Sequence, residues 1–462
     1  MKKKFNIKLL IIFIAIVIAS GYFLVNFSIK EKAGEKGRFE SFKSLLDSDT
    51  KRIIKKYIFP YKVITYQEKT IAKQKEILSP IEPYLLNLEI ETNESGTNIG
   101  VKESKIKLLN DKILKKYKLI SGFYVGIKNL TPGSGYLDFY EDNLFVVSSR
   151  GVLAFTKNLN ENDVIFRQIK NNINKFISFE QFKRSRKFSI KDLLIFNGKI
   201  YISYTAEIEQ DCWNNSIIYG DINYERIQFK KMFTPKECVH SKKNIDKEFT
   251  ASQSGGRMVK FDDSHILFSI GEYRSRHLAQ NEESVNGKVI KININSGDYK
   301  IISMGHRNPQ GLYFDKENNF ILETEHGPKG GDEINLIEIE KINKDKIQNY
   351  GWAIVSAGEH YGARTEKYPL YKSHSEYGFI EPLKSFVPSI GISEIVKIEK
   401  NNYVVSSLKD KSLYFFELNQ NREIVNLERL EVFERIRDLR FNQNKLYLFM
   451  ENTASIGVIN LN

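Results

Sequence analysis

The pattern of apolar and polar positions changes twice along this 462-residue chain. An apolar run extends from Leu9 to Ile29, close to the roughly 20 residues that cross a bilayer. Charged segments of helical periodicity then alternate with proline breaks. After Pro132, short apolar strands alternate with polar turns. These patterns predict three regions: a membrane anchor (1–30), a basic stem or accessory region (31–130) and a strand-rich domain (131–462).

Six segments of the strand-rich domain repeat one form, in which a polar turn joins two apolar strands. Asn197-Gly198 forms one of these turns and favours a two-residue hairpin. The copies start 44 to 83 residues apart, and three of the five intervals fall within the roughly 40 to 60 residues that suit propeller blades. A β-sandwich is the competing all-β interpretation, but six hairpins exceed a usual sandwich. The predicted fold is all-β: a six-bladed β-propeller preceded by a membrane anchor and a mixed helical stem. The hairpins begin at Gly135, Asp192, Arg257, Gly311, Glu394 and Asp438.

The positive charge of the chain is concentrated near its amino end. The formal net charge is +13, yet residues 1–130 carry 25 Lys and Arg against 13 Asp and Glu, while the rest carries 45 against 44. A basic stem beside an anionic membrane surface explains this distribution better than a nucleic-acid-binding face. A merely solvated lysine-rich stalk explains it equally well. We therefore expect no nucleic-acid partner.

The apolar run also bears on the location of the main domain. Apolar residues continue past Ala19-Ser20-Gly21, a weak cleavage site, which favours an uncleaved anchor over a cleaved signal peptide. The lysines before the run would stay in the cytoplasm, so we expect the main domain to be periplasmic or at the cell surface. Cys212 and Cys238, the only cysteines, are able to pair in an oxidising compartment, although the sequence leaves their pairing open.

The segment 306–337, HRNPQGLYFDKENNFILETEHGPKGGDEINLI, combines an Arg-Asn pair with glycine-rich turns and acids. Gly327-Pro328 and the glycines that follow permit turns that direct backbone carbonyls inward as ligands of a hard cation. Glu333 adds a carboxylate. This combination indicates a Ca²⁺ site beside an anion-binding arginine, Arg307, and an ordinary exposed turn is the alternative.

Three motifs, GHRNPQGLYFD, EHGPKGGDEINLI and NYGW, resemble in this order the soluble sugar dehydrogenases that use pyrroloquinoline quinone (PQQ), the glucose/sorbosone and aldose sugar dehydrogenase family. The resemblance extends from about Gly133 to the end of the chain and is weak before Gly255. It implies a six-bladed propeller with PQQ and Ca²⁺ as cofactors. The implied function is a membrane-anchored extracytoplasmic quinoprotein that oxidises an aldose sugar to its lactone and passes electrons to an unknown acceptor.

The resemblance also implies roles for individual residues. The backbone carbonyls of Gly327 and Pro328 would bind the Ca²⁺ of the cofactor, while Glu333 and Tyr350 match a second, structural Ca²⁺ site. Ordinary salt bridges are the alternative role for the strand arginines near the carboxyl end. The residues that would hold the cofactor are Arg307, Asn308, Tyr361, Lys409, Arg435 and Arg437.

The sequence departs from the family pattern at the catalytic base. Gln253 occupies the position of the family's catalytic His, and an amide cannot accept the proton of a sugar hydroxyl near neutral pH. Ser252, which precedes it, provides no carboxylate to orient an imidazole. His326 is the best-placed substitute, although a structural hydrogen-bonding role is the alternative. The family's upstream cofactor-binding Gln has no clear match between Lys187 and Asp192. A catalytically impaired propeller that serves as a binding module is therefore the alternative function.

Overall fold

The computed structural model describes residues 20, 60–78, 98–119, 134–157, 159, 164–185, 187–342, 346–361 and 368–461. The chain divides into two compact units, Met1–Gln74 and Lys75–Asn462. Helix α4 (Pro60–Leu78) provides helical structure in the expected stem. No helix among the described residues is both long enough and apolar enough to cross a bilayer. The predicted span Leu9–Ile29 lies, apart from Ser20, outside the described residues.

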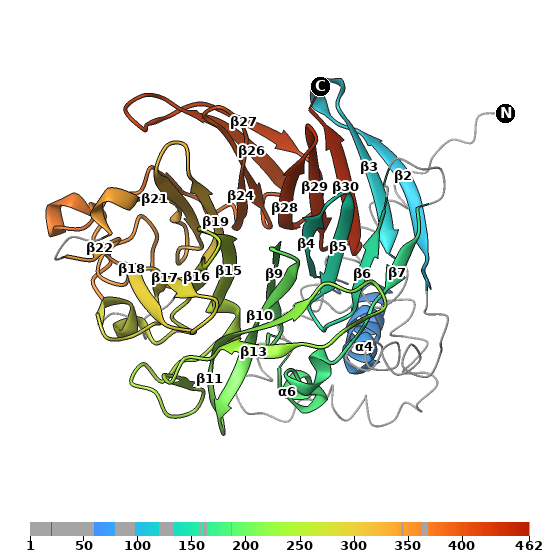
Figure 1. Ribbon diagram of the computed structural model, residues 1–462, viewed down its shortest axis with the longest axis horizontal. Helices are drawn as coiled ribbons and strands as arrows, with labels where there is room; N and C mark the ends of the chain where they lie inside the picture. The colour runs from blue at the N-terminus through green and yellow to red at the C-terminus, as the bar shows by residue number, and fades with distance from the viewer. Residues whose placement is uncertain are drawn as a thin grey trace. The chain divides into compact units, whose positions relative to one another are not determined.

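The described part of the second unit contains six mostly antiparallel sheets of four or five strands, arranged as a ring (Figure 1). Each inner strand contacts the inner strand of the next sheet, and the last contacts the first, so the ring is closed. The predicted six-bladed propeller is therefore confirmed. The inner strands are β4 (Gly135–Tyr140), β9 (Ile190–Phe196), β15 (Gly255–Lys260), β19 (Pro309–Asp315), β24 (Ile392–Glu399) and β28 (Ile436–Asn442).

The six predicted hairpins are the two innermost strands of the six blades. Asn197 and Gly198 have φ of 51° and 68°, the left-handed values that their two-residue turn requires. The second strands are β5 (Asn143–Ser148), β10 (Lys199–Glu209), β16 (His265–Ile270), β20 (Phe320–Glu325), β25 (Asn402–Ser407) and β29 (Lys445–Met450). The third strands are β6 (Leu153–Thr156), β11 (Cys212–Asp221), β17 (Lys288–Asn293), β21 (Asp332–Glu338), β26 (Ser412–Leu418) and β30 (Ser455–Asn460).

The outer parts of the blades are less regular than the inner hairpins. The fourth strands are β7 (Phe166–Gln168), β13 (Lys230–Phe233), β18 (Tyr299–Met304), β23 (Lys384–Phe386), β27 (Ile424–Glu431) and β3 (Ile113–Leu119). Further short strands are β1 (Asn98–Ile99), β2 (Val101–Lys107), β8 (Lys170–Asn171), β12 (Arg226–Ile227), β14 (Val239–His240) and β22 (Gln348–Asn349), and helix α6 is Phe179–Arg184.

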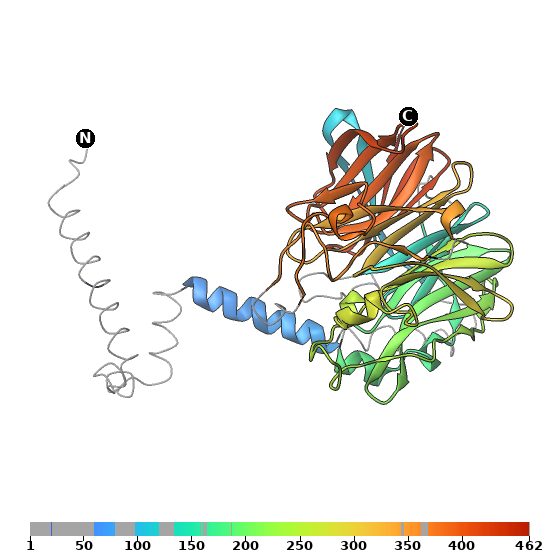
Figure 2. The ribbon, with the colours of Figure 1, turned by 90° about the vertical axis from the view of Figure 1, so that its left-hand side faces the viewer.

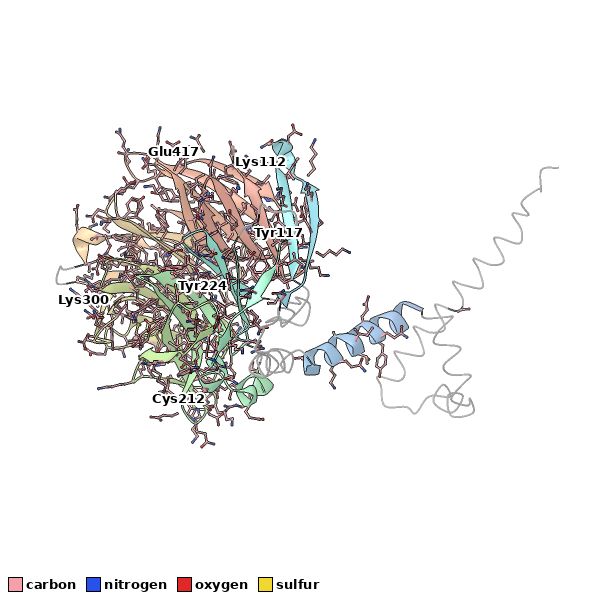
Figure 3. The ribbon with its side chains drawn as sticks, turned by 45° about the vertical axis from the view of Figure 1, so that its right-hand side comes forward. Lys112, Tyr117, Cys212, Tyr224, Lys300 and Glu417 are labelled. Carbon is pink, nitrogen blue, oxygen red and sulfur yellow. A yellow bond between two sulfur atoms is a disulfide. The ribbon has the colours of Figure 1, made fainter. Side chains whose placement is uncertain are left out.

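Strands from the expected stem complete the blades at the two ends of the propeller sequence. Strand β3 pairs with β30, β2 continues that sheet, and β1 pairs with β7. Figure 2 shows β2 and β3 in cyan beside the red C-terminal strands, and Figure 3 labels Tyr117 of β3. Tyr117 is buried against Phe449 and Ile456. Residues 98–119 of the expected stem therefore belong to the propeller sheets. Strand β2 is rich in lysine and mostly exposed, as is common for edge strands that avoid pairing with other chains. For this reason its sequence resembles that of a basic stem.

A disulfide joins Cys212, at the start of β11, to Cys238. The two Cα atoms are 5.4 Å apart, within the ordinary range for a disulfide. Beside it, Cys212 pairs with His240 of β14, so the bridge and the short strand attach the same loop to the blade. Figure 3 labels Cys212 at the rim of the propeller. The pairing that the sequence left open is thus present.

Candidate functional site

A cavity of about 500 Å³ lies where the inner strands of the propeller begin. Its lining comes from all six blades, so residues far apart in the sequence share one space. One lining residue from each blade shows this: Tyr136 of β4, Lys191 of β9, Gly255 of β15, Pro309 of β19, Gly391 before β24 and Arg437 of β28. All of the predicted cofactor-binding residues line the cavity as well: Arg307, Asn308, Tyr361, Lys409, Arg435 and Arg437.

One buried carboxylate holds two of the predicted arginines in place. Glu451 Oε1 accepts from Arg437 Nε at 2.7 Å, and Glu451 Oε2 accepts from Arg435 Nε at 3.0 Å. Although burial opposes ionisation, the two arginines keep the pKa of Glu451 below its usual range. Arg437 Nη1 also donates to Gln310 Oε1 at 3.1 Å. The guanidinium groups are therefore fixed by bonds on one side while they line the cavity.

The Arg-Asn pair before β19 is anchored by neighbouring loops. Arg307 Nη1 donates to the carbonyl of His326 at 2.7 Å, and the guanidinium lies 5.3 Å from the ring centre of Trp352. Asn308 Oδ1 accepts from the backbone N–H of Gly255 and from Gln310 Nε2, each at 3.1 Å. These contacts connect the start of β19 to the start of β15. The pair is buried, yet it lines the cavity.

Gln253 lies at the end of a short 3-10 helix, Ala251–Gln253, and lines the cavity. In the amide orientation that satisfies both of its neighbours, its nitrogen donates to Glu272 Oε1 at 2.7 Å and its oxygen accepts from Arg307 Nη2 at 2.5 Å. Burial raises the pKa of Glu272 to about 7, although Arg307 opposes this rise. No sequence motif pointed to Glu272. Glu272 could therefore orient a histidine at position 253. This corrects the expectation, based on Ser252, that no carboxylate is available to orient an imidazole there.

His326 also lines the cavity, so the structure places it near the position of the missing base. Burial is the main cause that lowers the pKa of His326 to about 4, so the imidazole is neutral near pH 7. Its Nε2 has no hydrogen-bond partner within the described part of the chain. His326 is thus a neutral ring with one unsatisfied nitrogen. The other motif histidines are engaged: His306 Nε2 lies 2.8 Å from Ser303 Oγ, and His360 Nε2 donates to the Tyr368 carbonyl at 2.6 Å.

The turn that follows His326 is built by close backbone approach. A Cβ at Gly327 would lie 1.8 Å from the carbonyl oxygen of Gly331, so only glycine fits there. Gly331 itself has a φ of 69°. Asp332 closes the turn, since its Oδ1 accepts from the Gly327 N–H at 3.1 Å and its Oδ2 from the Gly391 N–H at 2.6 Å. Gly327 and Pro328 both line the cavity, as a Ca²⁺ site beside the cofactor requires.

A second, small pocket adjoins the cavity through two shared residues, Arg307 and Gly327. Glu325, Glu333 and Tyr350 line it, so the structure brings together both residues that were predicted for the second Ca²⁺ site. We refer to this small space as the acidic pocket. Tyr350 is buried, and its hydroxyl donates to the carbonyl of Leu336 at 2.6 Å, so this hydroxyl is already engaged. Burial and the neighbouring Glu325 raise the pKa of Glu333 well above its usual range.

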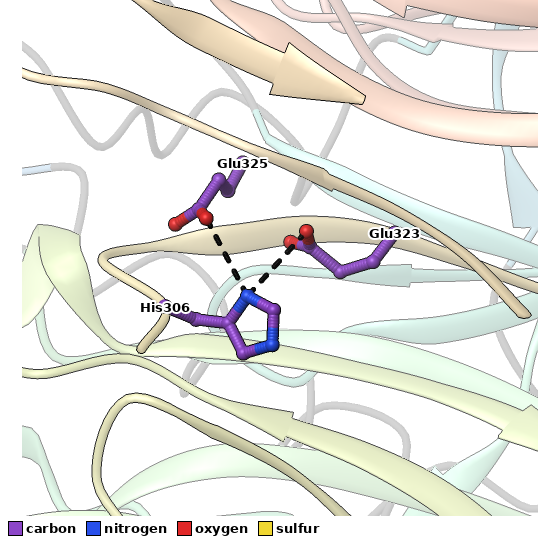
Figure 4. Close-up of side chains that lie close together, drawn as sticks. All are labelled: His306, Glu323 and Glu325. Atoms are coloured by element: carbon purple, nitrogen blue, oxygen red, sulfur yellow. Dashed lines mark hydrogen bonds and ion pairs between the residues drawn. The ribbon is translucent and has the colours of Figure 1, made fainter. Parts of the chain in front are cut away.

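One more buried acid, Glu323, lies beside the acidic pocket. His306 Nδ1 lies 3.4 Å from Glu325 Oε1 and 3.7 Å from Glu323 Oε2 (Figure 4). Burial and the adjacent Glu325 raise the pKa of Glu323 well above its usual range. Glu323 Oε1 and Asn335 Oδ1 have no partner among the described residues. Unsatisfied oxygens among several buried carboxylates are the donor set that a hard cation needs.

Charged side chains fill the channel next to the cavity. Arg257 forms ion pairs with acids from three other inner strands: Asp192 at 2.7 Å, Glu394 at 2.8 Å and Asp438 at 2.7 Å. Arg440 pairs with the same three acids. Burial raises the pKa of Glu394 to about 7 against the effect of Arg257. The inner strands are thus connected by buried charges, and a buried pair that loses one partner destabilises a fold strongly.

The fold and the site define a class: a six-bladed propeller with a cation-lined cavity at the start of its inner strands. The chain belongs to the glucose/sorbosone dehydrogenase family, which it matches over residues 195–458. It is 26% identical over 283 residues to the aldose sugar dehydrogenase YliI of Escherichia coli, covering 56% of this chain and 71% of that protein. The family expected from the motifs is therefore confirmed.

The chain is also similar to other proteins over part of its length. An uncharacterized Synechocystis protein is 30% identical over 216 residues, and the match spans 40% of this chain but only 50% of that protein. The quinoprotein glucose dehydrogenase B of Acinetobacter calcoaceticus is 32% identical over 131 residues, 22% of this chain and 26% of that protein. The crystal structure of the E. coli aldose sugar dehydrogenase in its apo-form has a TM-score of 0.55 at 20% identity, covering 70% of this chain and 95% of that chain, which shows the shared fold.

Proposed function

We propose that the chain is a membrane-anchored, extracytoplasmic quinoprotein that uses PQQ and Ca²⁺ to oxidise an aldose sugar to its lactone. The observation that carries this proposal is the cation-lined cavity, in which the predicted residues converge from separate blades. Family membership supports the dehydrogenase activity. The electrons would pass to an acceptor whose chemistry is open, and the sugar within the aldose class is open as well.

The lining of the cavity fits PQQ, which is a planar tricarboxylate. Its volume of about 500 Å³ falls within the usual range for small-molecule sites. Charge-assisted hydrogen bonds from guanidinium and ammonium groups are the strongest contacts available to carboxylates. When bound, the quinone would supply the two-electron oxidising power that no side chain provides. The residues that would hold it are Arg307, Asn308, Tyr361, Lys409, Arg435 and Arg437.

Two cation sites belong to the proposal. The carbonyls of Gly327 and Pro328 would bind Ca²⁺ in the cavity, and Glu333 with Tyr350 would hold a structural Ca²⁺ in the acidic pocket. The buried carboxylates of the acidic pocket support the second site, because bound Ca²⁺ would compensate their charge. Since the Tyr350 hydroxyl already donates to a carbonyl, its contribution to a cation would come from its backbone.

The proton acceptor is the part of the machinery that differs from the family. Gln253 cannot accept the proton of the sugar hydroxyl, because an amide has no basic site near neutral pH. We assign this role to His326, which lines the same cavity and whose Nε2 has no hydrogen-bond partner among the residues that the structure describes. Burial is the main cause that opposes protonation of this imidazole, and Arg437 and Arg307 add to it although Asp332 acts in the other direction, so its basicity is low. Slow turnover is therefore expected, and a binding module without turnover is the competing function.

The proposed location rests on two features. The apolar run from Leu9 to Ile29 is long enough for an anchor. The Cys212–Cys238 disulfide fits an oxidising compartment outside the cytoplasm. In this proposal, residues 1–30 form the anchor, the following residues form a basic stem beside the membrane, and the propeller lies beyond it.

The test is to add PQQ and Ca²⁺ to the full chain in detergent and to follow the quinone absorbance when aldoses are supplied. Sugar-dependent reduction supports the dehydrogenase, whereas tight PQQ binding without reduction supports the binding module. The absence of PQQ binding would reject both. His326→Ala should abolish reduction while PQQ still binds, and unchanged reduction in this variant would exclude His326 as the proton acceptor.

A further inference from the structure

Lys191, near the start of β9, is a cation of the cavity that the sequence motifs did not reveal. The side chain lines the cavity although the residue is only 8% exposed. Its Nζ donates to the carbonyls of Lys187 and Ala251, at 3.1 Å and 3.2 Å. Ala251 begins the short helix that carries Gln253, so the amine lies next to the segment where the family base would be.

The surroundings of Lys191 oppose a charge on its amine. The charged groups that act on it are Arg437 of β28, Arg150 between β5 and β6, and Lys187 before β9, all of them cations. Burial, together with these three cations, lowers the pKa of Lys191 to about 7. Gly256 packs directly against this side chain, because a Cβ there would lie 2.3 Å from Lys191 Cβ. The amine is therefore enclosed and is held by carbonyl oxygens rather than by a carboxylate.

The number of carbonyl groups bound to the Lys191 amine decides whether the amine has a hydrogen-bonding position left for a ligand. A neutral amine has two N–H groups and a lone pair, whereas an ammonium group has three N–H donors. The two carbonyl bonds of Lys191 satisfy both N–H groups of the neutral form and leave one position for a third contact. Protonation would create a third donor, which an entering acceptor would satisfy.

Lys288 provides a matched contrast elsewhere in the propeller. Burial lowers its pKa to about 7 as well, but its Nζ donates to three carbonyls, those of Leu278, Ala279 and Asn286, at 2.8 to 3.0 Å. All three donors of its ammonium form are therefore already used inside the protein. Lys288 does not line the cavity. Of these two buried lysines, Lys191 alone combines a free position with access to a ligand.

We propose that Lys191 couples anion binding to proton uptake: its amine is neutral in the ligand-free cavity and becomes an ammonium contact when a polycarboxylate enters. This inference rests on the proposed function, because PQQ is the polycarboxylate in question. A carboxylate near the amine removes the electrostatic cost that the three cations impose, so the bound state binds one proton more. Below about pH 7, where the amine is already charged in the free protein, the coupling disappears.

The test is calorimetric titration of the Ca²⁺-loaded full chain with PQQ at pH 8, in buffers of different ionisation enthalpy. An amine with a pKa of about 7 is about nine-tenths neutral at pH 8, so wild type should take up close to one proton for each PQQ bound. Lys191→Met should lose this uptake and about tenfold in affinity, which corresponds to the loss of one charge-assisted hydrogen bond. Lys191→Arg, which carries a permanent charge and keeps the length needed for folding, should bind PQQ without proton uptake. Lys288→Met should leave the uptake as in wild type.

Uptake that persists in Lys191→Arg or in Lys191→Met would overturn the inference. A second probe, benzene-1,3,5-tricarboxylate, separates this failure from failure of the proposed function. If wild type binds this probe with Lys191-dependent uptake while sugars never reduce bound PQQ, the dehydrogenase is rejected and the role of Lys191 stands. If neither probe binds to wild type, both are rejected.

Discussion

The cavity and the acidic pocket share Arg307 and Gly327, yet their remaining residues carry opposite charge. In the cavity, lysines and arginines outnumber the acids Asp332 and Glu451. In the acidic pocket, Glu325 and Glu333 lie beside one further buried carboxylate, that of Glu323. Because the two spaces are adjacent, their place in the fold does not explain the difference in the charge of their lining residues. The difference comes from the side chains that line each space: Glu325 of β20 and Glu333 of β21 in the pocket, and lysines and arginines from several blades in the cavity, such as Lys191 of β9 and Arg437 of β28.

The contrast indicates that each space selects its ligand by charge. Among the described residues, Glu323 Oε1 and Asn335 Oδ1 beside the acidic pocket lack a hydrogen-bond partner, whereas guanidinium and ammonium groups line the cavity. A buried charge without a partner is costly, so each excess is stabilised by a ligand of the opposite sign. Residues of the loop from His326 to Asp332 line both spaces. The two charge distributions therefore support the proposed anion in the cavity and the proposed cation in the pocket.

The largest expected effect comes from supplying the cavity with a base. Gln253→His should raise dye-linked aldose oxidation by about 10² to 10⁴, or about 3 to 5 kcal/mol, because Glu272 is placed to orient the imidazole. Gln253→Asn is the matched control and should show no gain. Adding Glu272→Gln to Gln253→His should remove most of the gain. A Gln253→His variant that binds PQQ but gains no rate would contradict the missing-base explanation.

The second prediction concerns the acid that lies against the cavity cations. Burial raises the pKa of Glu272 to about 7, so the folded state binds more protons than the unfolded state between about pH 4.5 and pH 7. The free energy of unfolding should therefore fall as pH rises through this window, by up to about 3 kcal/mol. Glu272→Gln remains neutral and should lack this decline. Urea unfolding of both proteins at pH 5 and pH 7.5 measures the difference, and parallel pH profiles would contradict it.

The third prediction tests whether the cavity is specific for anions. Arg435→Ala and Arg307→Ala should each weaken PQQ binding by about 1.5 to 3 kcal/mol, the contribution of a charge-assisted hydrogen bond. Lys69→Ala, on the exposed surface of α4, is the control and should bind as wild type does. Fluorescence titration of the purified variants gives the dissociation constants. Equal affinity in all three variants would contradict the assignment of the cavity.

Local patterns explain why much of this could be predicted from the sequence. Each blade begins with a hairpin whose alternating strands and turn residues are continuous in the chain, so six blades could be counted. Arg307, Lys409 and Arg437 were found because they stand in the short motifs GHRNPQGLYFD, SSLKDKSL and RIRDLRF. The closing strand β3 was missed because its pairing with β30 joins residues more than 300 positions apart. Strand pairing between distant residues leaves no pattern in the nearby sequence. Here the adjoining edge strand β2 is also rich in lysine, so it does not look like a strand of the propeller.

Glu272 and Lys191 were missed for a different reason. Each becomes functional through burial beside groups from other blades, which composition and spacing do not show. The Gly-Glu turn after β16 and the Lys before Asp192 look like ordinary surface residues in the sequence. The signal that could have drawn attention to Lys191 was the missing match for the upstream Gln, since an unexplained position in a motif marks a changed contact.

The last prediction concerns the acidic pocket and has the smallest expected effect. If Ca²⁺ binds only to the folded protein, a free concentration tenfold above its dissociation constant adds about 1.4 kcal/mol to the free energy of unfolding. Thermal unfolding with Ca²⁺ and with a chelator measures this gain. Glu333→Gln should reduce it, because a carboxylate of the pocket is lost, whereas Glu317→Gln, at an exposed carboxylate outside the pocket, should not. Arg435→Ala should weaken PQQ binding and keep the Ca²⁺ response, since Arg435 does not line the pocket. A Ca²⁺ response that disappears in Arg435→Ala and survives in Glu333→Gln would reverse the roles of the two spaces, because the cation would then depend on the cavity.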